Sequence, residues 1–177
     1  MSNVILETRR LRLRELTEDD LDFVAAMLDD ADVMRYYPSR LDRAGALAWI
    51  ERQQMRYARD GHGLWLVLDR ETDEPVGQVG LVTHELKGLP RPRYPEIGYL
   101  LHRPFWHRGL ATEAAAGVRD YAFRVQRYDQ VISLIRPTNE PSKAVARRLG
   151  MALIGETEFA GLPHLVFGLT AGGSASP

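Results

Sequence analysis

Three absences limit what this chain can be. It has no cysteine, which excludes disulfide bonds, thiolate metal ligands and a cysteine nucleophile. Its formal net charge is only −1, so no overall field attracts nucleic acid or an anionic membrane. No stretch approaches the roughly 20 apolar residues of a membrane span, and residues 1–14 lack the apolar core of a signal peptide. We therefore expect a cytoplasmic protein that binds neither nucleic acid nor membrane.

The length and composition are typical of one globular domain. The 177 residues are 45% hydrophobic and 27% charged, which is close to the average for such domains. No repeat or linker divides the chain. We expect a single domain over residues 1–171, followed by a tail over residues 172–177 whose glycine, serine and proline favour disorder.

Local patterns predict strands and helices in a mixed order. Alternating or continuous apolar runs predict about seven strands, over residues 10–16, 64–69, 75–82, 96–101, 130–135, 153–159 and 164–170. Helical spacing and capping residues predict helices that begin near Thr17, Asp42, Gly109 and Asn139. This order fits neither pure alternation nor full segregation of strands and helices. It favours a mixed α/β sheet with helices on both faces.

Glycine and proline add local detail to this pattern. Gly77 and Gly80 lie inside a predicted strand, where they indicate a bulge or a close approach of two backbones. One glycine and three prolines between residues 84 and 95 predict an irregular loop there.

The connection that leads into the third predicted helix is the most informative stretch. The small residues Gly109 and Ala111 lie where this helix begins. A helix start has unpaired N–H groups at the positive end of the dipole, so small residues there let a phosphate approach. Arg103, His107 and Arg108 add positive charge beside it. Taken alone, the pattern fits an ordinary strand–helix connection equally well.

The surrounding residues extend this pattern to a known family. Residues 99–114 resemble the coenzyme A signature of the GNAT N-acetyltransferases, and are closest to the RimJ/RimL-like branch. Residues 7–14, 139–142 and 149–151 resemble other parts of that branch. The resemblance implies the GNAT fold, with a mixed, mostly antiparallel sheet of about seven strands. It also implies an acyltransferase that uses acetyl-CoA as co-substrate.

The resemblance further implies which residues hold acetyl-CoA. Main-chain groups of the strand would bind the pantetheine arm and the acetyl carbonyl, and the helix start would bind the pyrophosphate. The implied cofactor-binding residues are Tyr99, Leu100, Leu101, His107, Arg108, Gly109, Leu110, Ala111, Thr112, Asn139 and Ser142. Asn139 is also among the best helix N-caps, so both roles stay open for it.

Two departures from the family pattern bear on the chemistry. Ala111 replaces the family's second glycine, which does not block backbone contact with a phosphate. Ala146 stands where many relatives have a tyrosine that protonates the departing thiolate, which leaves Ser142 as the candidate donor. The missing tyrosine also keeps open a second function, that of a non-catalytic acyl-CoA sensor or interaction module.

The chemistry of amide formation predicts a base. An amine attacks a thioester only when it is neutral, so the site must accept a proton. Glu96, near the start of the cofactor strand, is the first candidate. The alternative is an exposed strand carboxylate paired with Arg91 or Arg93. His84 and Glu85 are weaker candidates for the base.

The acceptor is expected to be a primary amine, on either a protein N-terminus or a small molecule. Loops over a rigid sheet often carry recognition, so we expect acceptor contacts from Tyr36, Tyr37 and Glu85, and from residues 159–164. No nucleophile–base set for an acyl-enzyme is visible, which makes direct transfer in a ternary complex the simplest scheme. No metal-ligand spacing occurs, so no metal is expected. Homodimer formation is left open.

Overall fold

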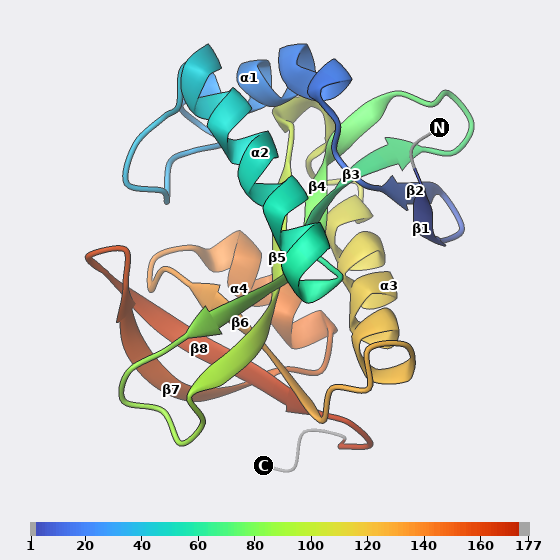
Figure 1. Ribbon diagram of the computed structural model, residues 1–177. Helices are drawn as coiled ribbons and strands as arrows, with labels where there is room; N and C mark the ends of the chain where they lie inside the picture. Colours follow the sequence, from blue (N-terminus) through green and yellow to red (C-terminus); the bar gives the residue numbers. More distant parts are fainter. Residues whose placement is uncertain (1–2, 174–177) are drawn as a thin grey trace.

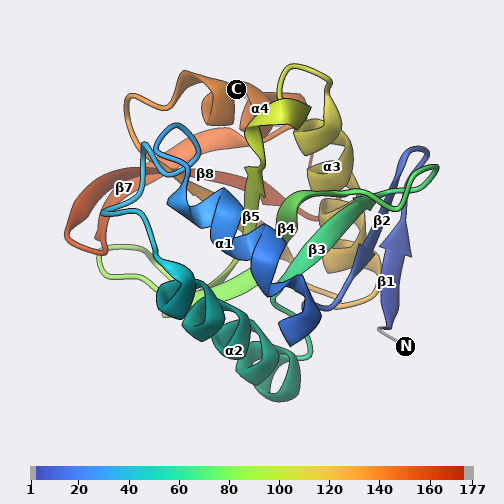
Figure 2. The same cartoon turned by 90° about the horizontal axis from the view of Figure 1, so that it is seen from above.

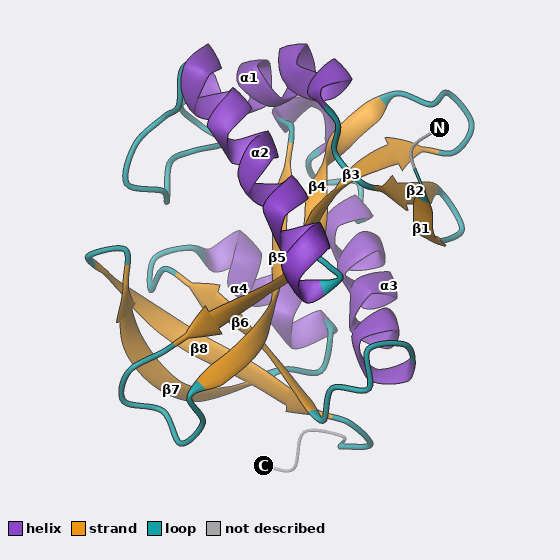
Figure 3. Ribbon diagram, in the orientation of Figure 1, coloured by secondary structure: helices purple, strands orange, loops and turns teal. Residues whose placement is uncertain are grey.

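The computed structural model describes residues 3–173 and contains one eight-stranded sheet. Figures 1 and 3 show the sheet crossing the molecule with helices on either side. The strands lie in the order β1-β2-β3-β4-β5-β6-β8-β7. They are β1 (Val4–Glu7), β2 (Leu11–Arg14), β3 (Leu64–Asp69), β4 (Pro75–Glu85), β5 (Arg93–Leu101), β6 (Gln130–Ile135), β7 (Ala152–Phe159) and β8 (Leu162–Thr170). The helices are α1 (Leu21–Asp29), α2 (Arg43–Asp60), α3 (Leu110–Arg124) and α4 (Glu140–Arg148).

The helices cover the two faces of the sheet in pairs (Figure 2). Helices α1 and α2 pack on one face, where Val24 and Ile50 join the cluster that contains Leu66 of β3. Helices α3 and α4 contribute to the cluster on the opposite face, which contains Trp65 and Val67 of β3. Successive strand side chains point to opposite faces, so the apolar run of β3 supplies both cores. The predicted mixed α/β sheet with helices on both faces is confirmed.

The sheet opens between β5 and β6. These strands run parallel and share a single register pair, Glu96 with Ile132, whereas all the other neighbouring strands are antiparallel. Beyond that pair, Ser133 Oγ donates to the carbonyl of Ile97 at 2.8 Å in place of a ladder bond. The carboxyl ends of β5 and β6 therefore diverge, and the divergence provides a crevice in the middle of the sheet.

The predicted strands match seven of the observed ones, and three details differ. Strand β1 was missed because its four residues form a short edge strand, partly exposed along its length. The predicted irregular loop over residues 84–95 is too long, since β4 continues to Glu85 and β5 starts at Arg93. Pro95 is tolerated inside β5 because the edge toward β6 carries so few ladder bonds. Of the predicted tail, residues 174–177 lie outside the described residues.

The helix boundaries follow the capping residues. Asp42 Oδ1 accepts from the Gly45 N–H at 2.8 Å at the start of α2, and Gly61 ends that helix at φ 74°. Thr17 and Asp20 form the predicted capping box, which opens a short 3₁₀ turn ahead of α1. None of the helices within residues 3–173 is long and apolar enough to cross a membrane.

Close backbone contact explains the two glycines of β4. A Cβ atom at Gly77 would lie 2.4 Å from the carbonyl oxygen of Leu100, and one at Gly80 would lie 2.0 Å from that of Gly63. Both distances are far inside van der Waals contact. The predicted close approach is confirmed. Gly77 packs against β5, the strand that lines the crevice, and Gly80 packs against the residue that precedes β3.

Candidate active site

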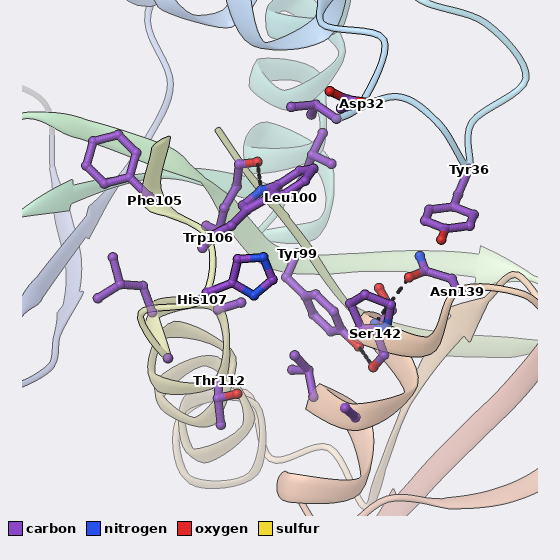
Figure 4. Close-up of a pocket in the computed structure, with 18 of the residues that line it drawn as sticks. Asp32, Tyr36, Tyr99, Leu100, Phe105, Trp106, His107, Thr112, Asn139 and Ser142 are labelled. Carbon is purple, nitrogen blue, oxygen red and sulfur yellow. Dashed lines mark hydrogen bonds between the residues drawn. The ribbon is translucent and has the colours of Figure 1, made fainter. Parts of the chain in front are cut away.

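A cleft of about 510 Å³ continues from the crevice between β5 and β6. Pockets of roughly 300–1,000 Å³ are typical of small-molecule sites. Strand β5, the start of α3 and the start of α4 form its walls, and the connection between α1 and α2 forms its roof (Figure 4). The cleft is lined by Asp32, Val33, Arg35, Tyr36, Tyr99, Leu100, Leu101, Phe105, Trp106, His107, Gly109, Leu110, Ala111, Thr112, Asn139, Pro141, Ser142, Ala144, Val145 and Arg148.

Ten of the eleven predicted cofactor residues line this one cleft; the exception is Arg108. Its guanidinium group lies over the Phe105 ring, 5.6 Å from the centroid, and its carbonyl accepts from Arg10 Nη1 at 3.1 Å. Two arginines that were not predicted as cofactor residues, Arg35 and Arg148, line the cleft instead. Arg148 lies four residues after Ala144 on α4 and therefore on the same helix face, whereas Arg35 lies on the roof and carries no sequence signal.

The start of α3 offers unpaired donors to the cleft. His107 and Gly109 have positive φ angles of 59° and 73°, and Gly109 is the N-cap. The first N–H of the helix to find a backbone acceptor is that of Glu113, which donates to Gly109 at 3.1 Å. Within residues 3–173, the preceding N–H groups of residues 110–112 have no acceptor. Such donors, at the positive end of a helix dipole, suit a phosphate group.

Glu113, in the first turn of α3, anchors this helix start to the sheet. Its carboxylate accepts from Thr8 Oγ1 at 2.6 Å, from the Arg10 N–H at 2.8 Å and from Arg10 Nε at 2.7 Å. Burial raises the pKa of Glu113, but the hydrogen bonds from Thr8 and Arg10 outweigh it and hold that pKa below its usual value. Because the partners lie more than 100 positions apart, sequence spacing gave no signal for this contact.

Asn139 has the capping role that the sequence left open, and its place in the cleft is compatible with the cofactor-binding role. Its Oδ1 accepts from the Ser142 N–H at 3.2 Å, which makes it the N-cap of α4. The residue also lines the cleft. An amide has donors as well as an acceptor, so capping through Oδ1 leaves the Nδ2 group available to a ligand.

Tyr99 has a side-chain role in addition to the main-chain role predicted for it. Its hydroxyl group donates to the Ser142 carbonyl at 2.8 Å and thereby joins β5 to α4 across the crevice (Figure 4). Burial and, second, the charge of Glu96 raise the pKa of Tyr99, so this hydroxyl group stays protonated as a donor. Ala146, which replaces the family's tyrosine, is fully buried in the core.

Glu96 is neither exposed nor paired with the arginines of the adjacent loop. Its Oε2 lies 2.5 Å from His84 Nε2, and its Oε1 accepts from the Leu134 N–H at 3.2 Å. Only 16% of the Glu96 side chain and 12% of the His84 side chain are exposed. Arg91 pairs with Asp129 at 2.6 Å instead. The alternative that made Glu96 an exposed, arginine-paired carboxylate is therefore wrong.

The predicted acceptor residues separate into three places. Tyr36 lines the cleft near Asn139 (Figure 4). Tyr37 lies outside the lining and packs edge-on against Trp49, with centroids 6.3 Å apart. Glu85 is exposed, and strand alternation turns it to the sheet face opposite to that of His84. Glu85 therefore does not join the other predicted site residues.

Known proteins resemble this chain in sequence. The family model of the acetyltransferase (GNAT) domain matches residues 10–152. The uncharacterized protein YkkB of Bacillus subtilis (strain 168) is 33% identical over 147 residues, which cover 82% of this chain and 84% of that protein. The spermidine N(1)-acetyltransferase of Escherichia coli (strain K12) is 27% identical over 148 residues, which cover 82% and 75% of the two chains.

Solved structures show the same arrangement of elements. An acetyltransferase from Agrobacterium tumefaciens str. C58 matches with a TM-score of 0.81 and 28% identity, over 97% of this chain and 96% of that one. RimL, a ribosomal-protein α-N-acetyltransferase in complex with coenzyme A, matches with a TM-score of 0.74 over 98% of this chain and all of that one. At 15% sequence identity, this match shows a shared fold and nothing more.

Proposed function

Because this chain belongs to the GNAT family of acetyl-CoA-dependent N-acetyltransferases, we propose that it acetylates a primary amine by direct transfer within a ternary complex. The acceptor would be a protein N-terminus or a small-molecule amine, as expected from the sequence. The observation that carries this proposal is the start of α3, where unpaired N–H groups border a cleft lined by ten of the predicted cofactor residues.

The residues present fit acetyl-CoA. The N–H groups of residues 110–112 would hold its pyrophosphate, with His107 at the rim of the cleft. Asn139 and the main chain of residues 99–101 would hold the pantetheine arm. Arg35 and Arg148 supply positive charge for the remaining phosphate. When bound, acetyl-CoA supplies the activated acyl group.

The crevice between β5 and β6 supplies the groups that act on the reacting atoms. Backbone N–H groups of β5 that β6 leaves unpaired would stabilise negative charge on the carbonyl oxygen. Glu96 pairs with His84 at the closed end of the crevice. We propose that this pair removes the proton from the attacking amine. Ser142, on the opposite wall, is the candidate donor to the departing sulfur.

The two acceptor classes have separate support. The relative named for spermidine supports a small amine, and the fold shared with RimL supports a protein N-terminus. A non-catalytic acyl-CoA sensor is the second candidate, and the buried Ala146 in place of the family's tyrosine favours it.

An acceptor screen with a free-thiol readout tests the proposed function. The panel contains spermidine, alkylamines and short peptides with a free N-terminus, and acetylated copies of the same peptides serve as controls. We expect thiol release with at least one free amine and none with the blocked peptides. Tight acetyl-CoA binding without thiol release from any amine would favour the sensor. Absence of acetyl-CoA binding would refute both functions.

A further inference from the structure

Glu96 bridges two strands through both of its oxygen atoms. Oε1 accepts from the main chain of β6 at Leu134, and Oε2 faces His84 of β4 at 2.5 Å. An ionised carboxylate can only accept, so the hydrogen of this second contact belongs to Nε2 of His84. In the form of the ring that acts as a base, only this nitrogen carries a hydrogen. The other ring nitrogen, Nδ1, then carries the lone pair. Within residues 3–173, Nδ1 has no hydrogen-bond partner.

The pair lies where the crevice closes. Glu96 forms the single register pair with β6, and the cleft lining begins three residues further along β5, at Tyr99. Three residues of strand span about 10 Å, so the pair lies about that far along β5 from the start of the cleft lining. The His84 ring is held edge-on against Phe159 of the β7–β8 hairpin, with centroids 4.7 Å apart. The predicted acceptor segment over residues 159–164 therefore meets the predicted base at this point.

We infer that His84 is the group that receives the amine proton, and that Glu96 is its positioning partner. This inference rests on the proposed function. A carboxylate that holds one imidazole nitrogen fixes the tautomer, orients the ring and stabilises the imidazolium ion that forms. Glu96 has both oxygens engaged, whereas His84 has a free lone pair.

The proton balance is complete without any further reagent. The amine nitrogen bonds to the carbonyl carbon while the carbon–sulfur bond breaks and its electron pair leaves with sulfur. The proton lost by nitrogen passes to His84 Nδ1, directly or through one water molecule, and then to solvent. Sulfur takes a proton from the Ser142 side of the cleft or from water.

Other ionisable groups surround the pair and bear on its titration. Burial, followed by the neighbouring Arg52, lowers the pKa of Arg56, and Glu96 partly opposes that change. The groups that face the pair are Tyr94 on β5, Tyr37 on the roof, Tyr99 on the crevice wall and Arg56 on α2, while His164 on β8 lies behind Phe159.

The test compares two neutral variants by their pH profiles, with the fastest amine of the acceptor screen as substrate. His84→Gln should lower kcat/KM about 100-fold or more and leave the Kd of acetyl-CoA unchanged. It should also remove the enzyme's contribution to the fall of kcat/KM at acidic pH, so that only the part caused by protonation of the amine itself remains. Glu96→Gln should keep that fall but move it to lower pH, because the imidazolium ion loses its carboxylate partner. Glu85→Gln is the matched control, since Glu85 is the next residue along β4 but is exposed and points to the sheet face opposite to that of His84, and it should retain the wild-type profile.

Chemical rescue separates proton transfer from a structural role. Added imidazole should restore part of the activity of His84→Ala and none of that of Glu96→Gln. The inference is overturned if His84→Gln keeps the wild-type rate and pH profile while Glu96→Gln removes the acidic fall, because Glu96 would then accept the proton itself. It is also overturned if His84→Ala binds acetyl-CoA normally and imidazole restores nothing. A failure of the proposed function looks different, since no amine then releases thiol from the wild-type protein.

Discussion

Single side chains in this protein connect segments that its sequence keeps apart. The Tyr99 hydroxyl group joins β5 to the first turn of α4, and Asn139 caps that turn beside it. Both residues also line the cleft. The same few atoms thus stabilise the fold and set the width of the crevice, so their substitution should affect stability and ligand binding together.

Tyr99→Phe tests this connection at one atom. The variant keeps the ring but loses the donor to the Ser142 carbonyl, which should cost about 1 kcal/mol of unfolding free energy. The Kd of acetyl-CoA should rise several-fold, because α4 is less firmly held. Urea unfolding and calorimetric titration measure the two effects. Tyr36→Phe is the control, because Tyr36 lines the same cleft without a hydrogen bond from its hydroxyl group to residues 3–173. Equal effects in both variants would contradict the expectation.

The start of α3 is the element on which the proposed cofactor binding depends. Its N-cap, Gly109, has a left-handed backbone conformation, and the N–H groups of residues 110–112 have no acceptor among residues 3–173. Glu113 anchors this helix start to the connection between β1 and β2. The sequence predicted the donors because small residues at a helix start are a local pattern. The anchor was not predicted, because it joins residues that are distant in the chain.

Gly109→Glu should abolish acetyl-CoA binding. The substitution places bulk and negative charge where the pyrophosphate is expected, and a non-glycine residue at φ 73° adds about 1–2 kcal/mol of strain. Gly88→Glu is the matched control, since Gly88 also has a positive φ, of 80°, and open space around its Cα atom. Calorimetry should detect binding in the control alone. Tight binding by Gly109→Glu would place the phosphate site elsewhere.

The pH dependence of the stability of Glu113→Gln should show how much this anchor contributes to the free energy of unfolding. The folded-state pKa of Glu113 lies below the unfolded value of about 4.3. Its stabilisation is therefore complete above that unfolded pKa and is lost as pH falls through the folded-state pKa. We expect Glu113→Gln to cost about 1–3 kcal/mol at pH 7, and the difference from wild type to shrink in acid. Urea unfolding at neutral and acidic pH measures this; a difference independent of pH would be inconsistent with the anchor.

At the scale of the whole molecule, the cleft lies where the sheet is least continuous. A single register pair joins β5 to β6. The connection between α1 and α2 that forms the roof is held by an ion pair, in which Asp32 Oδ2 lies 2.7 Å from Arg103 Nη1. A ligand that contacts β5, α3, α4 and the roof together would add non-covalent contacts between elements that make few direct contacts with one another. Binding should therefore raise the stability of the molecule as a unit.

Saturating acetyl-CoA should raise the melting temperature. At about 100 times its Kd, a ligand adds about 2.7 kcal/mol, which for a chain of this size corresponds to about 5–10 °C. Scanning fluorimetry measures the shift. ATP, which has phosphates but no pantetheine arm, should give a smaller shift at the same concentration. No shift with acetyl-CoA would argue against the cleft as its site.

The sequence by itself determined most of the secondary structure, the mixed sheet and the small-residue connection at the start of α3. These features depend on neighbours within a few positions: apolar periodicity for β3, capping for α2, and small residues at the start of α3. Tertiary structure alone decided the pairs His84–Glu96, Arg10–Glu113 and Tyr99–Ser142. The reason is physical, since such pairs depend on strand order, register and face, and Glu85 shows that one position along a strand is enough to turn a side chain away from the site.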